Sequence, residues 1–470
     1  MTRSTTTAWT FAITAIALFM VSLDNLVVTT ALPVIRNEFD ASLAELEWIV
    51  NAYTFTFAVL LLTGAALGDR FGRRRVFIVG LLLFTLGSAA AALSSSSTSL
   101  ILARAIQGIG GAIVMPLSLT ILANSVPVER RAVALGAWGA IGGLALAVGP
   151  LVGGAIAEGL TWQWIFWLNV PIGLIAMPLA ALRLTESHGP REGLDLPGLG
   201  LASVGLLALV SGLVRGNEVG WTDPTIIASL AAGIGFLAAF VGWEASAARP
   251  LVPLRLFRSG AFGGANLVSF LMSFGMFGSV FLLAQFFQLV QGYGPLDAGI
   301  RTLPWTAMPL IAAPLAGLAS VRIGPRPILA AGMVLQAASL AWIAAVATPT
   351  VAYGTLVPAF VVAGIGMGLF FAPIANVVLS SVHPTEEGKA SGVNNAIREV
   401  GGVFGVAVLA AVFSLAGDYG SAESFVSGLV PALWVGAAVV GVGAVAAVIT
   451  AVRPAAASSI ASREGVPAAA

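Results

Sequence analysis

Asp24 and Arg104 are charged residues inside long apolar stretches of the sequence, where chemistry on protons and cations is possible. Asp24 is the single carboxylate that the predicted membrane spans place in mid-membrane, a costly position that indicates function. Burial raises the pKa of a carboxyl group and a nearby cation lowers it. A moving arginine or an arriving cationic substrate would therefore switch the protonation of such an acid, which favours Asp24 as a proton-coupling and cation-binding group.

Arg104 is the predicted partner of Asp24. Counted from the outer ends of their stretches, the two residues differ in depth by about 8 Å at the helical rise, within reach of a long side chain. Two alternatives stay open. Asp24 is purely structural if it only accepts hydrogen bonds from a neighbouring helix, and Arg104 is only an anchor if its side chain reaches the outer lipid headgroups.

Other residue types exclude several classes of chemistry. The chain has no cysteine, and His188 and His383 lie far apart in polar stretches, so disulfides, thiol catalysis and the usual Cys/His metal sites are excluded. The single lysine, Lys389, lacks the Gly-rich approach of a phosphate-binding loop. No nucleophile with a nearby base is apparent in any apolar stretch. We therefore expect no enzymatic residues, metal or cofactor, and the net charge of +1 gives no reason to expect nucleic acid as a partner.

The composition requires lipid around the elements that position these residues. Of 470 residues, 58% are apolar and 9% are charged, against about 25% charged in a soluble domain. A helix crosses the bilayer with about 20 apolar residues. The sequence predicts an all-α integral membrane protein with fourteen spans near 8–33, 47–68, 76–93, 100–123, 133–157, 162–182, 196–214, 225–243, 261–285, 299–320, 327–346, 353–380, 393–415 and 430–451.

Basic residues indicate the orientation. Of the 22 Lys and Arg residues, eighteen fall in the termini and loops of one side, whereas Arg36, Arg215 and Arg301 fall on the other. Loops rich in Lys and Arg stay in the cytoplasm. We therefore expect a multi-pass protein of the plasma membrane with both termini in the cytoplasm and residues 215–218 in an outer loop.

Three glycine-rich motifs occur in the first half of the chain. Residues 64–75 read GAALGDRFGRRR, residues 104–112 read RAIQGIGGA, and residues 149–154 read GPLVGG. The first allows a tight turn with a carboxylate and several arginines, and the last leaves one helix face almost without side chains. Each pattern also suits ordinary membrane-helix packing and a positively charged anchor.

Together these motifs resemble those of the major facilitator superfamily, and the third is similar to the superfamily's antiporter motif. With fourteen spans, and with Leu23-Asp24-Asn25 and 162–173 in spans one and six, the chain resembles the 14-spanner drug:proton antiporter family. The resemblance implies a major facilitator fold of two six-helix bundles, 1–183 and 259–453. A linker with two additional spans at 184–258 joins them, a disordered cytoplasmic tail follows at 454–470, and the protein is a monomer surrounded by membrane lipids.

The resemblance also implies roles for individual residues. Substrate-binding residues are expected to include aromatic and polar side chains near mid-membrane: Asp24, Asn25, Tyr53, Gln107, Trp138, Phe274, Phe277 and Phe281. Proton coupling falls to Asp24 and Arg104. Conformational switching falls to the turn and the glycine-rich helix: Gly64, Asp69, Arg70, Gly72, Arg73, Gly149, Pro150, Gly153 and Gly154.

The expected function is export of a lipophilic, cationic small molecule in exchange for external protons by alternating access. Export of one dedicated metabolite, antibiotic or lipid by the same mechanism is the first alternative, and a membrane-embedded enzyme or sensor is a remote one. Glu47 and Glu158, at outer span ends, are weaker proton sites. Glu399 is expected near the cytoplasmic side, in an ion pair with Arg398.

Overall fold

The fold is helical throughout the described chain, which covers residues 3–189, 195–383 and 386–449 of a computed structural model. Fourteen helical stretches in these residues are long and apolar enough to cross a membrane. The predicted all-α class and the number of spans are both confirmed. The predicted tail at 454–470 lies outside the described residues.

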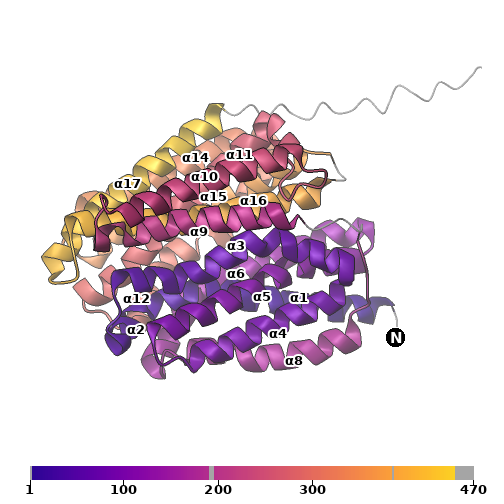
Figure 1. Ribbon diagram of the computed structural model, residues 1–470, viewed down its shortest axis with the longest axis horizontal. Helices are drawn as coiled ribbons and strands as arrows, with labels where there is room; N and C mark the ends of the chain where they lie inside the picture. The colour runs from indigo at the N-terminus through magenta and orange to yellow at the C-terminus, as the bar shows by residue number, and fades with distance from the viewer. Residues whose placement is uncertain (1–2, 190–194, 384–385, 450–470) are drawn as a thin grey trace, which may run out of the picture.

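The helices up to residue 183 form the lower layer in Figure 1 and are called the first bundle here. Its elements are α1 (Arg3–Val27), η1 (Val28–Thr30), α2 (Leu32–Phe39), α3 (Leu43–Phe71), α4 (Arg73–Ala92), α5 (Ser97–Ser125), α6 (Val128–Gly159), α7 (Trp164–Trp167) and α8 (Asn169–Arg183). Its interior packs α3 against α5, α5 against α4 and α1 against α6.

The helices after residue 259 are called the second bundle, and two extra spans precede it along the chain. Most of it forms the upper layer in Figure 1, whereas the helix Pro295–Thr306 (α12) lies lower and packs against α6. The elements are α9 (Leu196–Val219), α10 (Pro224–Ser246), η2 (Leu254–Arg258), α11 (Gly260–Gln285), η3 (Phe286–Val290), α12 (Pro295–Thr306), α13 (Pro309–Ile323), α14 (Pro325–Val346), α15 (Tyr353–Ser380), α16 (Glu387–Ala416) and α17 (Ala422–Ile449). Helix α9 packs against α3 of one bundle and α16 of the other. Helix α10 packs on α9, and only 11% of its most apolar 18-residue segment is buried within the protein. This exposed face of α10 suits contact with lipid.

Helix ends explain where the predicted boundaries were wrong. The last span begins at Ala422 rather than near 430, and residues 215–218 form the end of α9 instead of a loop, so the link to α10 is 220–223. Polar residues there do not stop the helix, because its backbone hydrogen bonds are internal and the segment has left the hydrocarbon. Asp223 starts α10 instead, accepting a hydrogen bond from the backbone N–H of Thr225 at 2.8 Å.

The link between α9 and α10 offers a direct test of the orientation expected from the basic residues. The chain has no native cysteine, so a single Thr222→Cys substitution at this exposed link can be labelled selectively. We expect an impermeant thiol reagent to label Thr222→Cys in intact cells. A cysteine at the exposed His188, beyond the end of α8, should react only after the membrane is permeabilised. The reverse pattern would contradict cytoplasmic termini.

Candidate functional site

Asp24 is the centre of a buried polar network inside the first bundle. Its Oδ2 pairs with Nη1 of Arg104, and its Oδ1 accepts hydrogen bonds from Nε2 of Gln107 at 3.2 Å and Nδ2 of Asn169 at 3.1 Å. Asp24 and Arg104 are each 1% exposed, and Gln107 is fully buried. Helices α1, α5 and α8 thus bring together residues that lie 80 and 145 positions apart in the sequence.

Arg104 is satisfied on several sides. Besides Asp24, its Nη1 donates to Oε1 of Gln107 at 2.9 Å and its Nε donates to the backbone carbonyl of Ile49 at 3.2 Å. Its guanidinium also lies 4.3 Å from the ring centre of Tyr53. The side chain therefore points toward Asp24 and not toward the headgroups. Removing one partner of such a buried pair leaves an uncompensated charge, at a cost of about 3–5 kcal/mol.

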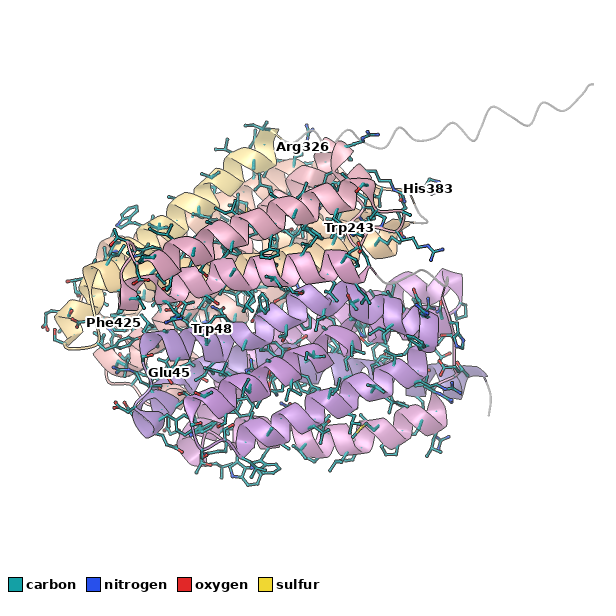
Figure 2. The ribbon with its side chains drawn as sticks, viewed as in Figure 1. Glu45, Trp48, Trp243, Arg326, His383 and Phe425 are labelled. Atoms are coloured by element: carbon teal, nitrogen blue, oxygen red, sulfur yellow. The ribbon has the colours of Figure 1, made fainter. Side chains whose placement is uncertain are left out.

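A cavity of about 1720 Å³ lies between the two bundles. Its wall includes Tyr53, Phe57 and Trp138 from the first bundle and Phe277 and Phe371 from the second. The cavity extends to the end of the molecule where Asp69, Arg73 and Lys389 lie. Figure 2 places Trp243 and His383 at this same end and Glu45 and Phe425 at the opposite one. A space of this size with aromatic walls suits a lipophilic small molecule.

The expected substrate-binding residues divide into two groups. Tyr53, Trp138 and Phe277 belong to the cavity wall. Among the described residues, Asp24, Gln107, Phe274 and Phe281 are buried away from that wall. The backbone of Phe274 lies where α11 crosses Gly405 of α16, so this part of α11 packs against another helix. The side chain of Asn25 lies outside the described residues.

Tyr53 is the side chain that joins the cavity to the polar network. Its hydroxyl donates to the backbone carbonyl of Val21 at 3.1 Å, and its ring lies between the cavity and the Arg104 guanidinium. Arg104 lies over its ring, and Tyr53 and Glu399 both belong to the cavity wall. A ligand in the cavity can therefore influence the Asp24 network through one side chain.

Glu399 forms the expected ion pair with Arg398 and has a second environment in the structure. The pair with Arg398 is present, with Nη2 and Oε1 3.3 Å apart, but Glu399 is 3% exposed and forms part of the cavity wall. Its helix starts at Glu387, six residues before the predicted limit, so Glu399 lies about 15 Å beyond Lys389 at the helical rise. Asp24 is thus not the only buried acid within the described spans. The Arg-Glu dipeptide inside an apolar helix was the signal.

The turn between α3 and α4 is stabilised by charged side chains of the turn itself and by one carboxylate from a segment distant in sequence. Asp69 pairs with Arg73 at 2.7 Å, and the carboxylate of Glu186 accepts from the backbone N–H of Arg74 at 2.9 Å and of Arg75 at 3.3 Å. Gly72 between the helices has a φ of 105°, which L side chains rarely adopt. Glu186 could not be assigned to this turn from the sequence, because no local pattern links the two segments.

The bundle ends opposite the cavity opening are joined by contacts between the two bundles. Glu158 of α6 accepts a hydrogen bond from the backbone N–H of Leu296 at 3.0 Å, and Nε2 of Gln288 donates to the carbonyl of Thr30 at 2.8 Å. Arg36 lies 4.1 Å from the ring centre of Tyr419. Burial raises the pKa of Tyr419 and Arg36 opposes this shift, so the phenol stays neutral.

The glycines of α6 serve two different contacts. Gly149 and Gly153 face α1 in the same bundle, whereas Gly154 faces the backbone of Pro295 and Leu296 at the start of α12 in the other bundle. Gly299 of α12 approaches the carbonyl of Pro150 in return. Small residues therefore allow α6 and α12 to close one end of the cavity.

Comparison with known proteins agrees with this architecture. The sequence matches the Major Facilitator Superfamily over residues 14–406 and 265–469. It is 40% identical over 429 residues to the cephamycin export protein CmcT of Amycolatopsis lactamdurans, covering 87% of this chain and 85% of that one. It is 35% identical over 397 residues to the tetracenomycin C resistance and export protein of Streptomyces glaucescens, covering 84% and 74%.

Solved structures support the same fold. A POT family transporter in complex with a thioalcohol-conjugated peptide matches with a TM-score of 0.70 and 14% identity, over 93% of this chain and 94% of that one. A bacterial homologue of the human lysosomal transporter Spinster, described as inward-facing and unoccupied, matches with a TM-score of 0.65 and 17% identity, over 95% and 97%.

The chain is therefore a membrane transporter and not an enzyme. It belongs to the major facilitator superfamily, and its fourteen spans and antibiotic-exporting relatives place it in the 14-span group of that superfamily.

Proposed function

We propose that this protein exports lipophilic, cationic drugs or toxic compounds from the cytoplasm in exchange for protons, by alternating access. The observation that carries the proposal is the aromatic-walled cavity of about 1720 Å³, open at one end of the bundles and closed at the other. With the basic loops in the cytoplasm, the open end faces inward, ready to take up a substrate. Exchange then requires the opposite ends to separate.

In this proposal the Asp24 network carries the proton. The Asp24 carboxylate is paired with Arg104 and bound by two amides, and separating the pair would make the carboxylate available to a proton. Tyr53 belongs to the cavity wall and also contacts Arg104, so substrate binding and protonation can be coupled even when the substrate does not touch Asp24. A direct substrate contact with Asp24, expected from the sequence, requires this network to open.

Conformational switching is assigned to the two ends of the bundles. Asp69, Arg70, Gly72 and Arg73 lie at the turn at the open end, whereas Gly64 lies inside α3 and packs against Ala112 and Ile113 of α5. Gly149, Pro150, Gly153 and Gly154 lie on α6 toward the closed end. Breaking the contacts of one end while forming those of the other would reverse the access of the cavity. The bundle limits at 183 and 259 and a monomeric state complete the proposal.

A second candidate is export of one dedicated antibiotic, metabolite or lipid. The relatives favour it, because several are named for a single compound: cephamycin, tetracenomycin C and, in Streptomyces alboniger, puromycin. Geometry alone does not separate the two candidates, since one cavity would serve both.

Flux in proteoliposomes tests the proposed function, and a resistance profile separates its two forms. We expect reconstituted protein to move a lipophilic cation such as ethidium against its gradient when an opposing proton gradient is imposed. Cells expressing the protein should tolerate several unrelated lipophilic cations if export is broad, and one compound if it is dedicated. Proteoliposomes that move neither cations nor antibiotics under a proton gradient would contradict the proposal.

A further inference from the structure

Glu399 carries an inference that the superfamily fold does not supply. We propose that Glu399 is the group in the cavity that binds the cationic centre of the substrate, and that this site is separate from Asp24. The inference rests on the proposed export of lipophilic cations and adds the residue that recognises the charge.

The first observation is an unsatisfied carboxylate in the cavity wall. Glu399 is 3% exposed, and its Oε2 is buried without a hydrogen-bond partner among the described residues. Its Oε1 accepts from Nη2 of Arg398 at 3.3 Å, a long contact between sequence neighbours. Leaving a buried charged acceptor unpaired is costly. An incoming cationic donor would remove that cost.

The second observation is the apolar surrounding of this carboxylate. Of the helices that pack against α16, α11 and α15 contain no charged residue, whereas α3 carries its charged residues near its two ends, at Glu45, Glu47, Asp69 and Arg70. The cavity wall near mid-membrane supplies aromatic side chains from both bundles: Tyr53, Phe57, Trp138, Phe277 and Phe371. Aromatic faces attract cations and cover flat apolar groups. A carboxylate among such side chains selects a lipophilic cation over a neutral compound of the same size.

The third observation distinguishes Glu399 from Asp24. Both oxygens of Asp24 are engaged by Arg104, Gln107 and Asn169, behind Tyr53 and away from the cavity wall. Glu399 has one engaged oxygen and belongs to that wall. Arg398 has an alternative partner, since its guanidinium lies 5.7 Å from the ring of Phe371 and its side chain is 22% exposed. A cation can therefore replace Arg398 at Glu399.

Protons compete with the substrate at this carboxylate. Glu399 pairs with Arg398 on its own helix. The other helices that pack against α16 and carry charges are α3 with Glu45, Glu47, Asp69 and Arg70, α9 with Arg215 and Glu218, and α17 with Glu423. The remaining charged residues of the cavity wall are Asp69, Arg73, Asp195, Glu244, Arg249, Arg255, Arg258 and Lys389. Protonation removes the counter-charge of the substrate, so cation affinity should fall as the pH is lowered, whereas affinity for a neutral compound should not.

Equilibrium binding to the full-length protein in nanodiscs tests the inference with two fluorescent probes, ethidium as a lipophilic cation and Nile red as a neutral lipophile. We expect Glu399→Gln to weaken ethidium binding by about tenfold or more, the value of a hydrogen bond to a charged group. The variant should leave Nile red affinity unchanged and abolish the pH dependence of ethidium binding. Glu423→Gln, which removes an exposed carboxylate from the first turn of α17, is the matched control.

The outcomes separate this inference from the proposed function. Unchanged ethidium affinity in folded Glu399→Gln, beside normal binding by the unsubstituted protein, would overturn the role of Glu399 and leave the export function standing. Equal loss of both probes would indicate a merely structural residue and would also overturn it. If Glu399→Gln does not fold, the same measurements on Glu399→Asp decide. This variant keeps the charge but moves the carboxylate back by one methylene group, so ethidium binding should weaken while Nile red binding stays unchanged. Weaker ethidium binding with unchanged Nile red binding supports the inference, and no change refutes it.

Discussion

Asp24→Asn is expected to abolish export driven by a pH gradient. The substitution keeps the shape of the side chain and removes the group that takes up and releases the proton. Exchange of one proton for one monovalent cation moves no net charge, so a pH gradient should drive export in the unsubstituted protein and a membrane potential alone should not. Flux of ethidium in proteoliposomes under each gradient measures both expectations.

The buried position of Asp24 requires a second variant. Asp24→Asn leaves Arg104 without its counter-charge, which costs about 3–5 kcal/mol and can impair folding by itself. Combining Asp24→Asn with Arg104→Gln removes both charges, so the double variant should be the more stable of the two and still fail to export. If the double variant recovers gradient-driven export, Asp24 serves only to neutralise Arg104, and the proton must be carried by Glu399, Glu47 or Glu158.

The number of spans and the Asp24–Arg104 pair could be predicted because both depend only on distances along the chain. Span length follows from the thickness of the bilayer, and runs of apolar residues record it directly. The depth of a residue follows from its distance to the span end, which placed Arg104 within reach of Asp24. Helix ends were less predictable, because helices such as α17 continue beyond the hydrocarbon.

Contacts between distant helices could not be predicted. Gly153 and Gly154 are adjacent and identical in sequence, yet one faces α1 and the other faces α12. The phenylalanines of α11 share a helical spacing, but only their packing against α16 decides that Phe277 belongs to the cavity wall. The place of Glu399 in the cavity wall could not be predicted, because it depends on which face of α16 meets the cavity. These properties depend on which faces meet, and a single sequence does not record that.

Gly154→Ala is expected to prevent closure of the bundle ends opposite the cavity opening. A Cβ atom at Gly154 would lie 2.3 Å from the carbonyl oxygen of Pro295 and 2.8 Å from Cα of Leu296. Both are backbone atoms, so α6 and α12 must separate. Overpacking of this kind costs about 1–3 kcal/mol, and because only the closed state bears the cost, the population shifts by about 5- to 150-fold toward opening at that end.

Thr30→Cys reports this shift, because Thr30 is 1% exposed at the closed end and its carbonyl accepts a hydrogen bond from Gln288 of the other bundle. An impermeant thiol reagent added to intact cells should label Thr30→Cys slowly alone and at least several-fold faster with Gly154→Ala, while export falls. Gly159→Ala adds the same methyl group to the same helix where nothing lies within 4 Å, so it should change neither rate. If Gly154→Ala lowers export without faster labelling, the glycine serves packing within the membrane and the contact with α12 does not control access to the cavity.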